Sequence, residues 1–147
     1  MASLWSFLLV FHLIGLALGV GSATAKVVLL VKCYRDITFV PFYLKVMVPL
    51  TRTLVLGLIL MTVSGIIWLI RGYGFPATMI VKLVFVGAVW VVGLLIDNVT
   101  EPRFRKLAPA QGAKASAAFI LIQKKHLALE VIGTLLFYII LVLGVLL

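Results

Sequence analysis

The stretch Phe11-His12-Leu13-Ile14-Gly15-Leu16-Ala17-Leu18-Gly19 lies within an apolar run from about Leu4 to Val31 and decides how the chain folds. The run carries a ladder of small residues, Gly15, Gly19 and Ala23, at every fourth position. On a helix this spacing places all three on one face, where a second helix can approach closely. His12 precedes Gly15 by three residues, so we expect it to face protein rather than lipid.

The composition indicates an integral membrane protein. Hydrophobic residues make up 65% of the 147 residues and the mean hydropathy is +1.31, whereas soluble domains are about half apolar. The formal charge of +9 comes from 13 Lys and Arg against 4 Asp and Glu, which gather at the ends of apolar runs. Such flanks meet anionic lipid headgroups, so we expect the lipid bilayer as partner and no nucleic acid.

Four apolar segments are long enough to cross a bilayer, which takes about 20 helical residues. We expect helices over about 3–32, 50–70, 77–97 and 126–147, with Pro49 at the start of the second. These form one domain, 1–147, with an all-α fold: a four-helix transmembrane bundle.

The connecting segments have characters of their own. Residues 37–48 mix aromatic residues with proline, which suits a segment at the membrane interface. The longest polar segment runs from Asp97 to Lys125, and residues 113–123 within it favour a helix.

The distribution of Lys and Arg sets the orientation. The segments joining helices one to two and three to four hold, with their flanks, Lys26, Lys32, Arg35, Lys45, Arg52, Arg103, Arg105, Lys106, Lys114, Lys124 and Lys125. The other side has only Arg71 and Lys82. Basic loops stay in the cytoplasm. Both termini are therefore expected on the outer side, of the bacterial inner membrane in the simplest case.

Two features near the start of the chain need an interpretation. Ala23-Thr24-Ala25 looks like a signal-peptide cleavage site, but no basic residue precedes Leu4 and the apolar run is too long, so we expect an uncleaved helix. Cys33 is the only cysteine, which excludes an intrachain disulfide and a cysteine metal site.

Polar side chains from three helices fall at one depth near the outer side. Counting helix rise from that side places His12 at roughly 12 Å, Lys82 and Ser64 at roughly 9 Å, and Met61 at roughly 14 Å. These four residues are the candidate lining of a cofactor pocket. The alternatives are that Ser64 bonds to its own helix, that Lys82 reaches the interface, and that His12 is a packing residue.

A second polar set lies near the cytoplasmic side. His126 and Glu130 are four residues apart and share a helix face. Lys26 lies at a similar depth and Arg52 begins the second helix nearby, so Glu130 has basic partners available. We favour a structural ion pair of Lys26, Glu130 and His126 over a proton relay.

The two histidines are not expected to hold one haem together. Their helices place them roughly 20 Å apart along the membrane normal, whereas bis-histidine ligation needs both at one iron. His12 is therefore the candidate haem iron ligand, with Met61, Met79, another chain or no group as its second ligand. We find no ligand set for zinc or copper.

The pattern Phe11-His12-Leu13-Ile14-Gly15 resembles the first helix of small bacterial four-helix membrane proteins, the CopD-like and HemJ-like group and related families. The similarity continues at Arg52, Gly65 and Lys82-Leu83. In that group the histidine of helix one and the lysine of helix three are associated with haem or porphyrin chemistry, or with copper handling. The resemblance implies that His12 is an axial ligand and Lys82 a propionate or substrate partner.

Two functions are consistent with these features. The first is a haem- or porphyrin-binding membrane protein that uses the pocket around His12 and Lys82. The alternative is a non-catalytic accessory subunit that self-associates or packs against a larger membrane complex. Transport is a weaker third reading, because small multidrug-type transporters use a carboxylate in helix one and this helix has none. We identify no catalytic residues.

Overall fold

The computed structural model describes residues 2–72 and 77–145, and within these ranges every element is helical. The elements are α1 (Ala2–Arg35), η1 (Ile37–Phe39), α2 (Val40–Ile70), α3 (Ala77–Leu95), η2 (Ile96–Thr100), α4 (Glu101–Leu107) and α5 (Ala117–Val145). Four stretches are long and apolar enough to cross a membrane: Leu4–Arg35, Ile37–Ile70, Ala77–Leu107 and Ala117–Val145. The prediction of an all-α fold with four long apolar helices is confirmed.

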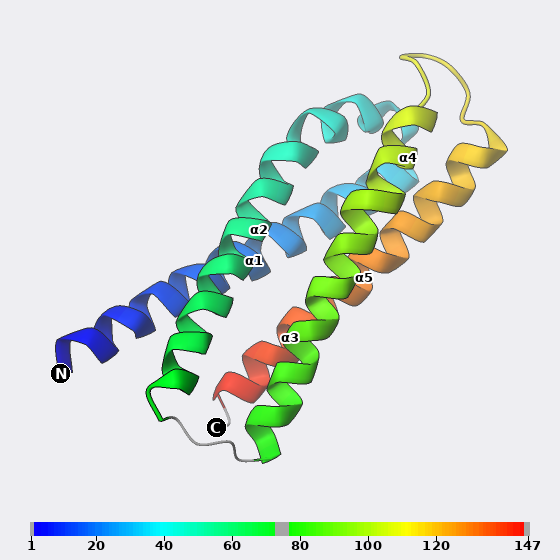
Figure 1. The fold of residues 1–147 in the computed structure, drawn as a ribbon. Coiled ribbons are helices and arrows are strands. Elements are labelled where there is room, and N and C mark those ends of the chain that lie inside the picture. The colour runs from blue at the N-terminus through cyan, green and yellow to red at the C-terminus, as the bar shows by residue number, and fades with distance from the viewer. Residues whose placement is uncertain (1, 73–76, 146–147) are drawn as a thin grey trace.

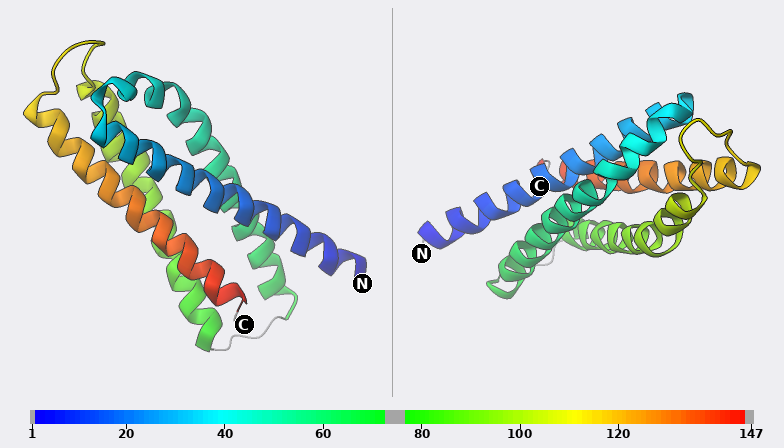
Figure 2. Two further views of the ribbon diagram at one scale, coloured as in Figure 1. Left: turned by 180° about the vertical axis from the view of Figure 1, so that it is seen from behind. Right: turned by 90° about the horizontal axis from the view of Figure 1, so that it is seen from above.

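The four long helices form a bundle with two distinct ends (Figure 1). One end, here called the loop end, holds the α1–α2 connection and the loop between α4 and α5. The opposite, terminal end holds both chain termini, and the start of α1 projects away from the other helices (Figure 2). Helix α2 packs chiefly on α1, while α5 packs on both α1 and α3. Helices α2 and α3 do not pack closely on each other, and side chains occupy the space between them.

Glycines bring α1 and α2 into direct backbone contact. A Cβ atom added to Gly57 of α2 would lie 2.5 Å from the backbone nitrogen of Gly19, and one added to Gly15 would lie 2.8 Å from the carbonyl oxygen of Gly57. The small-residue face of α1 is therefore used inside the bundle. This contact sets the antiparallel register of the two helices, which places His12 beside Ser64 and Lys26 beside Thr51.

Helix α2 begins ten residues before the expected position. Pro41 occupies its first turn, where the missing N–H costs nothing, and Pro49 lies inside the helix rather than at its start. The segment expected at the interface is the first part of this helix. Its residues Val40, Tyr43 and Met47 are fully buried in a cluster that also contains Leu30, Cys33, Phe104, Phe119 and Ile122.

The third long apolar stretch also extends beyond the expected end at residue 97. It continues through the π-helical turn η2 into α4, so the first part of the expected polar loop is helical. Ile96, Thr100 and Phe104 recur every fourth residue and are buried, which gives this polar segment a packing face. Helix α5 begins at Ala117, capped by the Ser116 hydroxyl, and absorbs most of the helix expected at 113–123.

Candidate functional site

The predicted pocket residues meet at a cavity of about 100 Å³ near the terminal end, between α2 and α3. His12, Met61 and Lys82 line this terminal-end cavity, and Ser64 lies behind His12. Its further lining includes Thr62, Trp68, Met79, Leu58 and Phe137. The structure thus brings together the four residues that the sequence analysis singled out from three different helices.

The hydrogen bonds of Ser64 favour a proton on Nδ1 of His12. The Ser64 hydroxyl donates to the carbonyl oxygens of Leu60, at 2.7 Å, and Met61, at 3.1 Å. Its oxygen is then left as the acceptor for His12 Nδ1, 2.8 Å away. A neutral imidazole with its proton on Nδ1 has a bare lone pair on Nε2. The backbone of Met61 also lies within hydrogen-bonding range of the His12 ring.

The surroundings of His12 hold its ring and add one positive charge. The Trp68 ring lies 5.2 Å from the imidazole, between ring centroids. Lys82 is half-buried, and within 4–72 and 77–145 its ammonium forms no ion pair or hydrogen bond. This ammonium lies beside Gly144 near the end of α5. The cavity therefore offers an imidazole and an uncommitted cation.

The chemistry of these groups fits a haem, but the cavity is too small to enclose one. An imidazole with its other nitrogen hydrogen-bonded is the usual form of a histidine that ligates a metal, and Met61 and Met79 supply thioethers of the type found opposite histidine in some haem proteins. A cavity of about 100 Å³ is small, because sites for drug-sized ligands measure about 300–1,000 Å³. A porphyrin therefore requires the space between α2 and α3 to widen.

The second predicted set forms a buried ionic network near the loop end. Lys26 is 1% exposed, and its Nζ lies 2.5 Å from Oε1 of Glu130, an oxygen with no other hydrogen-bond partner among the described residues. Lys26 also donates to Thr51 Oγ1 at 3.0 Å and lies 3.7 Å from Glu101. Glu101 in turn faces the exposed Arg105 at 3.4 Å. Every charge in this network has a partner of opposite sign.

Both ring nitrogens of His126 contact hydroxyl groups inside the bundle. It is fully buried, with Thr100 Oγ1 2.9 Å from Nδ1 and the Tyr43 hydroxyl 3.4 Å from Nε2. Oε1 of Glu130 is 3.9 Å from Nε2, too far for a hydrogen bond. The predicted trio of Lys26, Glu130 and His126 does lie together, with His126 at its edge.

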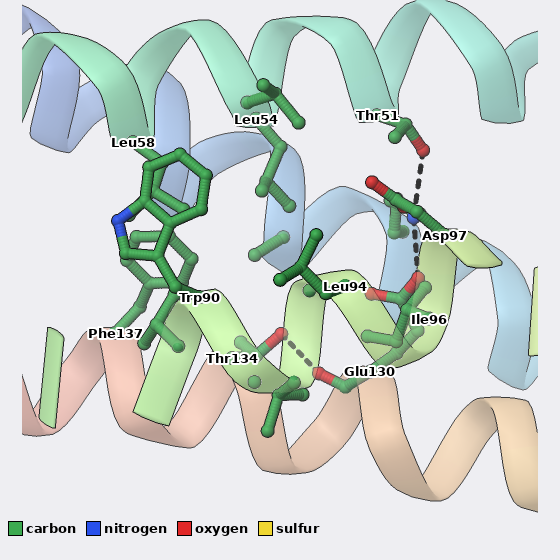
Figure 3. Close-up of a pocket in the computed structure, with 17 residues that line it drawn as sticks. Thr51, Leu54, Leu58, Trp90, Leu94, Ile96, Asp97, Glu130, Thr134 and Phe137 are labelled. Carbon is green, nitrogen blue, oxygen red and sulfur yellow. Dashed lines mark hydrogen bonds and ion pairs between the residues drawn. The ribbon is translucent and has the colours of Figure 1, made fainter. Parts of the chain in front are cut away.

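A larger cavity of about 190 Å³ adjoins the ionic network (Figure 3). This loop-end cavity has apolar walls from Leu54, Leu58, Val89, Trp90 and Phe137. Its polar lining consists of Lys26, Thr51, Asp97, Glu130 and Thr134. Figure 3 shows Asp97 reaching into the space below Thr51 from the third long apolar stretch.

Several partners in the network were not expected from the sequence. Arg52 is exposed, and its neighbour Thr51 faces Lys26 instead, because one residue turns a helix by about 100°. Glu101 and Thr100 were placed in a loop. Their four-residue spacing to Arg105 and Phe104 is the signal that indicates a helix with one buried face there.

The fold and the two polar regions define a class: an all-α protein of four long apolar helices with ionisable groups buried between them. Comparisons of the chain with protein-family models, curated proteins and solved structures gave no significant match.

Proposed function

We propose that this protein spans a membrane with both termini outside and binds haem or a related porphyrin at His12 and Lys82. The carrying observation is that His12 lines the cavity with its Nδ1 engaged by Ser64, so that a proton on Nδ1 makes Nε2 the nitrogen able to ligate a metal. The basic residues exposed at the loop end support a cytoplasmic position for that end.

Each residue has a stated part in binding. His12 would hold the iron through a ring nitrogen, and Ser64 would orient the ring through its contact with Nδ1. Lys82 supplies a positive charge for a propionate carboxylate, and Met61 lies on the same cavity as a second candidate ligand. A bound haem would supply redox chemistry, and the apolar lining would keep water away from it.

The test is a haem titration of the protein in mild detergent, followed by absorbance. We expect His12→Ala to abolish the Soret shift, and Lys82→Gln to weaken binding while leaving the shape of the spectrum unchanged. Lys45→Gln is the matched control, because Lys45 is exposed at the opposite end. Equal binding by the wild type and His12→Ala would refute the proposal.

A second candidate, an accessory subunit of a larger membrane complex, is favoured by the projecting start of α1 (Figure 1). Here Trp5, Phe7, Val10 and Leu13 are exposed, with Phe7 at 60%. Such a face suits either lipid or a partner helix. Purification in mild detergent separates the candidates: a subunit would co-purify with larger proteins and lack visible absorbance of its own.

A further inference from the structure

Three cavities follow one another along the bundle. The terminal-end cavity and the loop-end cavity share Leu58 and Phe137 as wall residues. The loop-end cavity shares Asp97 with a third cavity of about 410 Å³, which opens at the surface beside Glu101, Pro102, Arg105 and Lys106. The two inner cavities lie between α2 and α3, and the third is an open hollow on the surface of η2 and α4, so the row runs from the exposed loop end to the neighbourhood of Lys82.

We propose that this row of cavities is a proton pathway through the membrane-spanning bundle. Protons enter at the surface cavity, pass Asp97 and Glu130, and leave through the terminal-end cavity. The proposal does not rest on haem binding, because the carboxylates that carry it belong to the loop-end half.

The loop-end half provides a chain of polar contacts that reaches Glu130, and Asp97 lines the cavity beside this chain without a direct contact to it. From the exposed Arg105 the chain leads to Glu101 at 3.4 Å, and from Glu101 to the Thr51 hydroxyl at 3.2 Å. Thr51 accepts from Lys26 at 3.0 Å, and Lys26 meets Glu130. A carboxylate can take a proton from one side and release it on the other, so the net change is one proton moved. Lys26 balances the negative charge between transfers.

Charge counting supports proton uptake at this place. Asp97, Glu101 and Glu130 contribute three carboxylates, against the ammonium of Lys26 and the guanidinium of Arg105. His126 and Tyr43 face the same network from α5 and α2 and bond to each other. Among the described residues Asp97 forms no ion pair within 4 Å, which makes it the carboxylate best placed to exchange protons with the surface cavity. Intramembrane carboxylate chains of this kind mark proton relays in pumps and transporters.

Water completes the path where side chains do not touch. The loop-end cavity of about 190 Å³ has a mostly apolar lining in which Lys26, Thr51, Asp97, Glu130 and Thr134 are the polar groups. Water, at about 30 Å³ per molecule in the liquid, would enter beside these groups.

An apolar constriction closes the middle of the pathway. Figure 3 shows Leu58 of α2, Trp90 of α3 and Phe137 of α5 close together on the wall of the loop-end cavity. Leu58 and Phe137 also line the terminal-end cavity, and the Trp90 indole donates to Thr62 at 3.2 Å. Apolar constrictions gate conduction by excluding water. These side chains separate the two inner cavities in this structure.

The test measures proton flux into vesicles that contain the purified full-length protein and an internal pH-sensitive dye. A potassium gradient with valinomycin supplies the driving force. We expect flux above that of protein-free vesicles, and an increase in Leu58→Ala, which shortens a side chain of the constriction. Asp97→Asn and Glu130→Gln, each placed in the Leu58→Ala background, should return the flux to that of protein-free vesicles.

The matched control is Asn98→Ala in the same background, since Asn98 is exposed and bonds only to its own helix at Leu94. It should leave flux unchanged. Circular dichroism and gel filtration check that each variant is folded. Flux equal to protein-free vesicles in both the wild type and Leu58→Ala would overturn the proposal, and so would undiminished flux in Asp97→Asn. Haem titration of Asp97→Asn should match the wild type, which keeps the two proposals separable.

Discussion

His12 and His126 have similar contacts at Nδ1 but different surroundings at Nε2. Both present Nδ1 to a hydroxyl whose own proton can go to a backbone carbonyl: Ser64 for His12 and Thr100 for His126. Nε2 of His126 meets Tyr43 in a fully buried site, whereas the ring of His12 is only partly buried and lines a cavity. A hydrogen bond between Nδ1 and a hydroxyl therefore does not by itself indicate a ligand site. What distinguishes the two histidines is whether Nε2 contacts another side chain or faces a cavity.

The two lysines within the long apolar helices, Lys26 and Lys82, show the same contrast. Lys26 contacts Glu130, Thr51 and Glu101, so its charge is balanced within the fold. Lys82 lines its cavity and, within the described ranges, meets no acidic side chain. The loop-end region thus stabilises the bundle, and the terminal-end region keeps groups available for a ligand.

The largest expected effect comes from the two lysines. Lys26→Met should lower the free energy of unfolding by about 3–5 kcal/mol, because it leaves Glu130 buried without a counter-charge. Lys82→Met should leave stability close to that of the wild type. Thermal unfolding in detergent measures both, and equal losses would remove the distinction between the regions.

A second comparison uses the histidines. His126→Ala should cost about 3 kcal/mol, since it opens a cavity and leaves Tyr43 and Thr100 without their partner. His12→Ala should cost less, because only Ser64 loses a bond and that hydroxyl keeps its carbonyl acceptors. Denaturant titration followed by circular dichroism compares them. A larger loss for His12→Ala would assign it a structural role.

The glycine contact can be tested on one helix. Gly57→Ala should destabilise by about 1–3 kcal/mol, because the new methyl group meets the backbone of α1. Gly65→Ala is the control, since no other atom lies within 4 Å of its added Cβ, and it should stabilise by up to about 1 kcal/mol through helix propensity. Both polar regions depend on this contact, so Gly57→Ala should also weaken haem binding. Two variants of equal stability would show that the close approach is not required.

The smallest effect is expected at Asp36, in the turn between α1 and η1. Hydrogen bonds from the Thr38 hydroxyl and backbone N–H hold the pKa of this carboxyl below its usual value. Its contribution to stability is therefore present above the unfolded-state pKa of about 3.9 and is lost as the pH falls through the lower folded-state pKa. Asp36→Asn keeps the cap without the charge. It should remove this component of acid sensitivity in melts between neutral and acidic pH, and a variant as acid-sensitive as the wild type would contradict the assignment.

The sequence predicted the existence of the four long helices well, because hydropathy alone identifies long apolar segments. It predicted their ends poorly. Pro49 looked like a helix start, but a proline on the exposed side of a helix is tolerated when the apolar pattern around it continues to pack. The charged residues after Asp97 looked like a loop, although Thr100 and Phe104 bury one face of a helix.

The sequence predicted which residues of the candidate sites lie at the same height along the bundle. His12 with Ser64, and Lys26 with Glu130, sit at matching heights on antiparallel helices, so counting residues was enough to pair them. Counting residues did not predict the direction in which each side chain points around its helix axis. For this reason Thr51 replaced Arg52 as the partner of Lys26, and the tautomer of His12 emerged only from the bond to Ser64.

The most direct measurement of the central proposal is the absorption spectrum of the protein purified in mild detergent from cells that make haem, first oxidised and then reduced with dithionite. The proposal predicts a Soret band and sharpened bands in the visible region on reduction, all absent from His12→Ala purified in the same way. A wild-type spectrum without visible absorbance, from protein that is folded and retains its helix content, would contradict it.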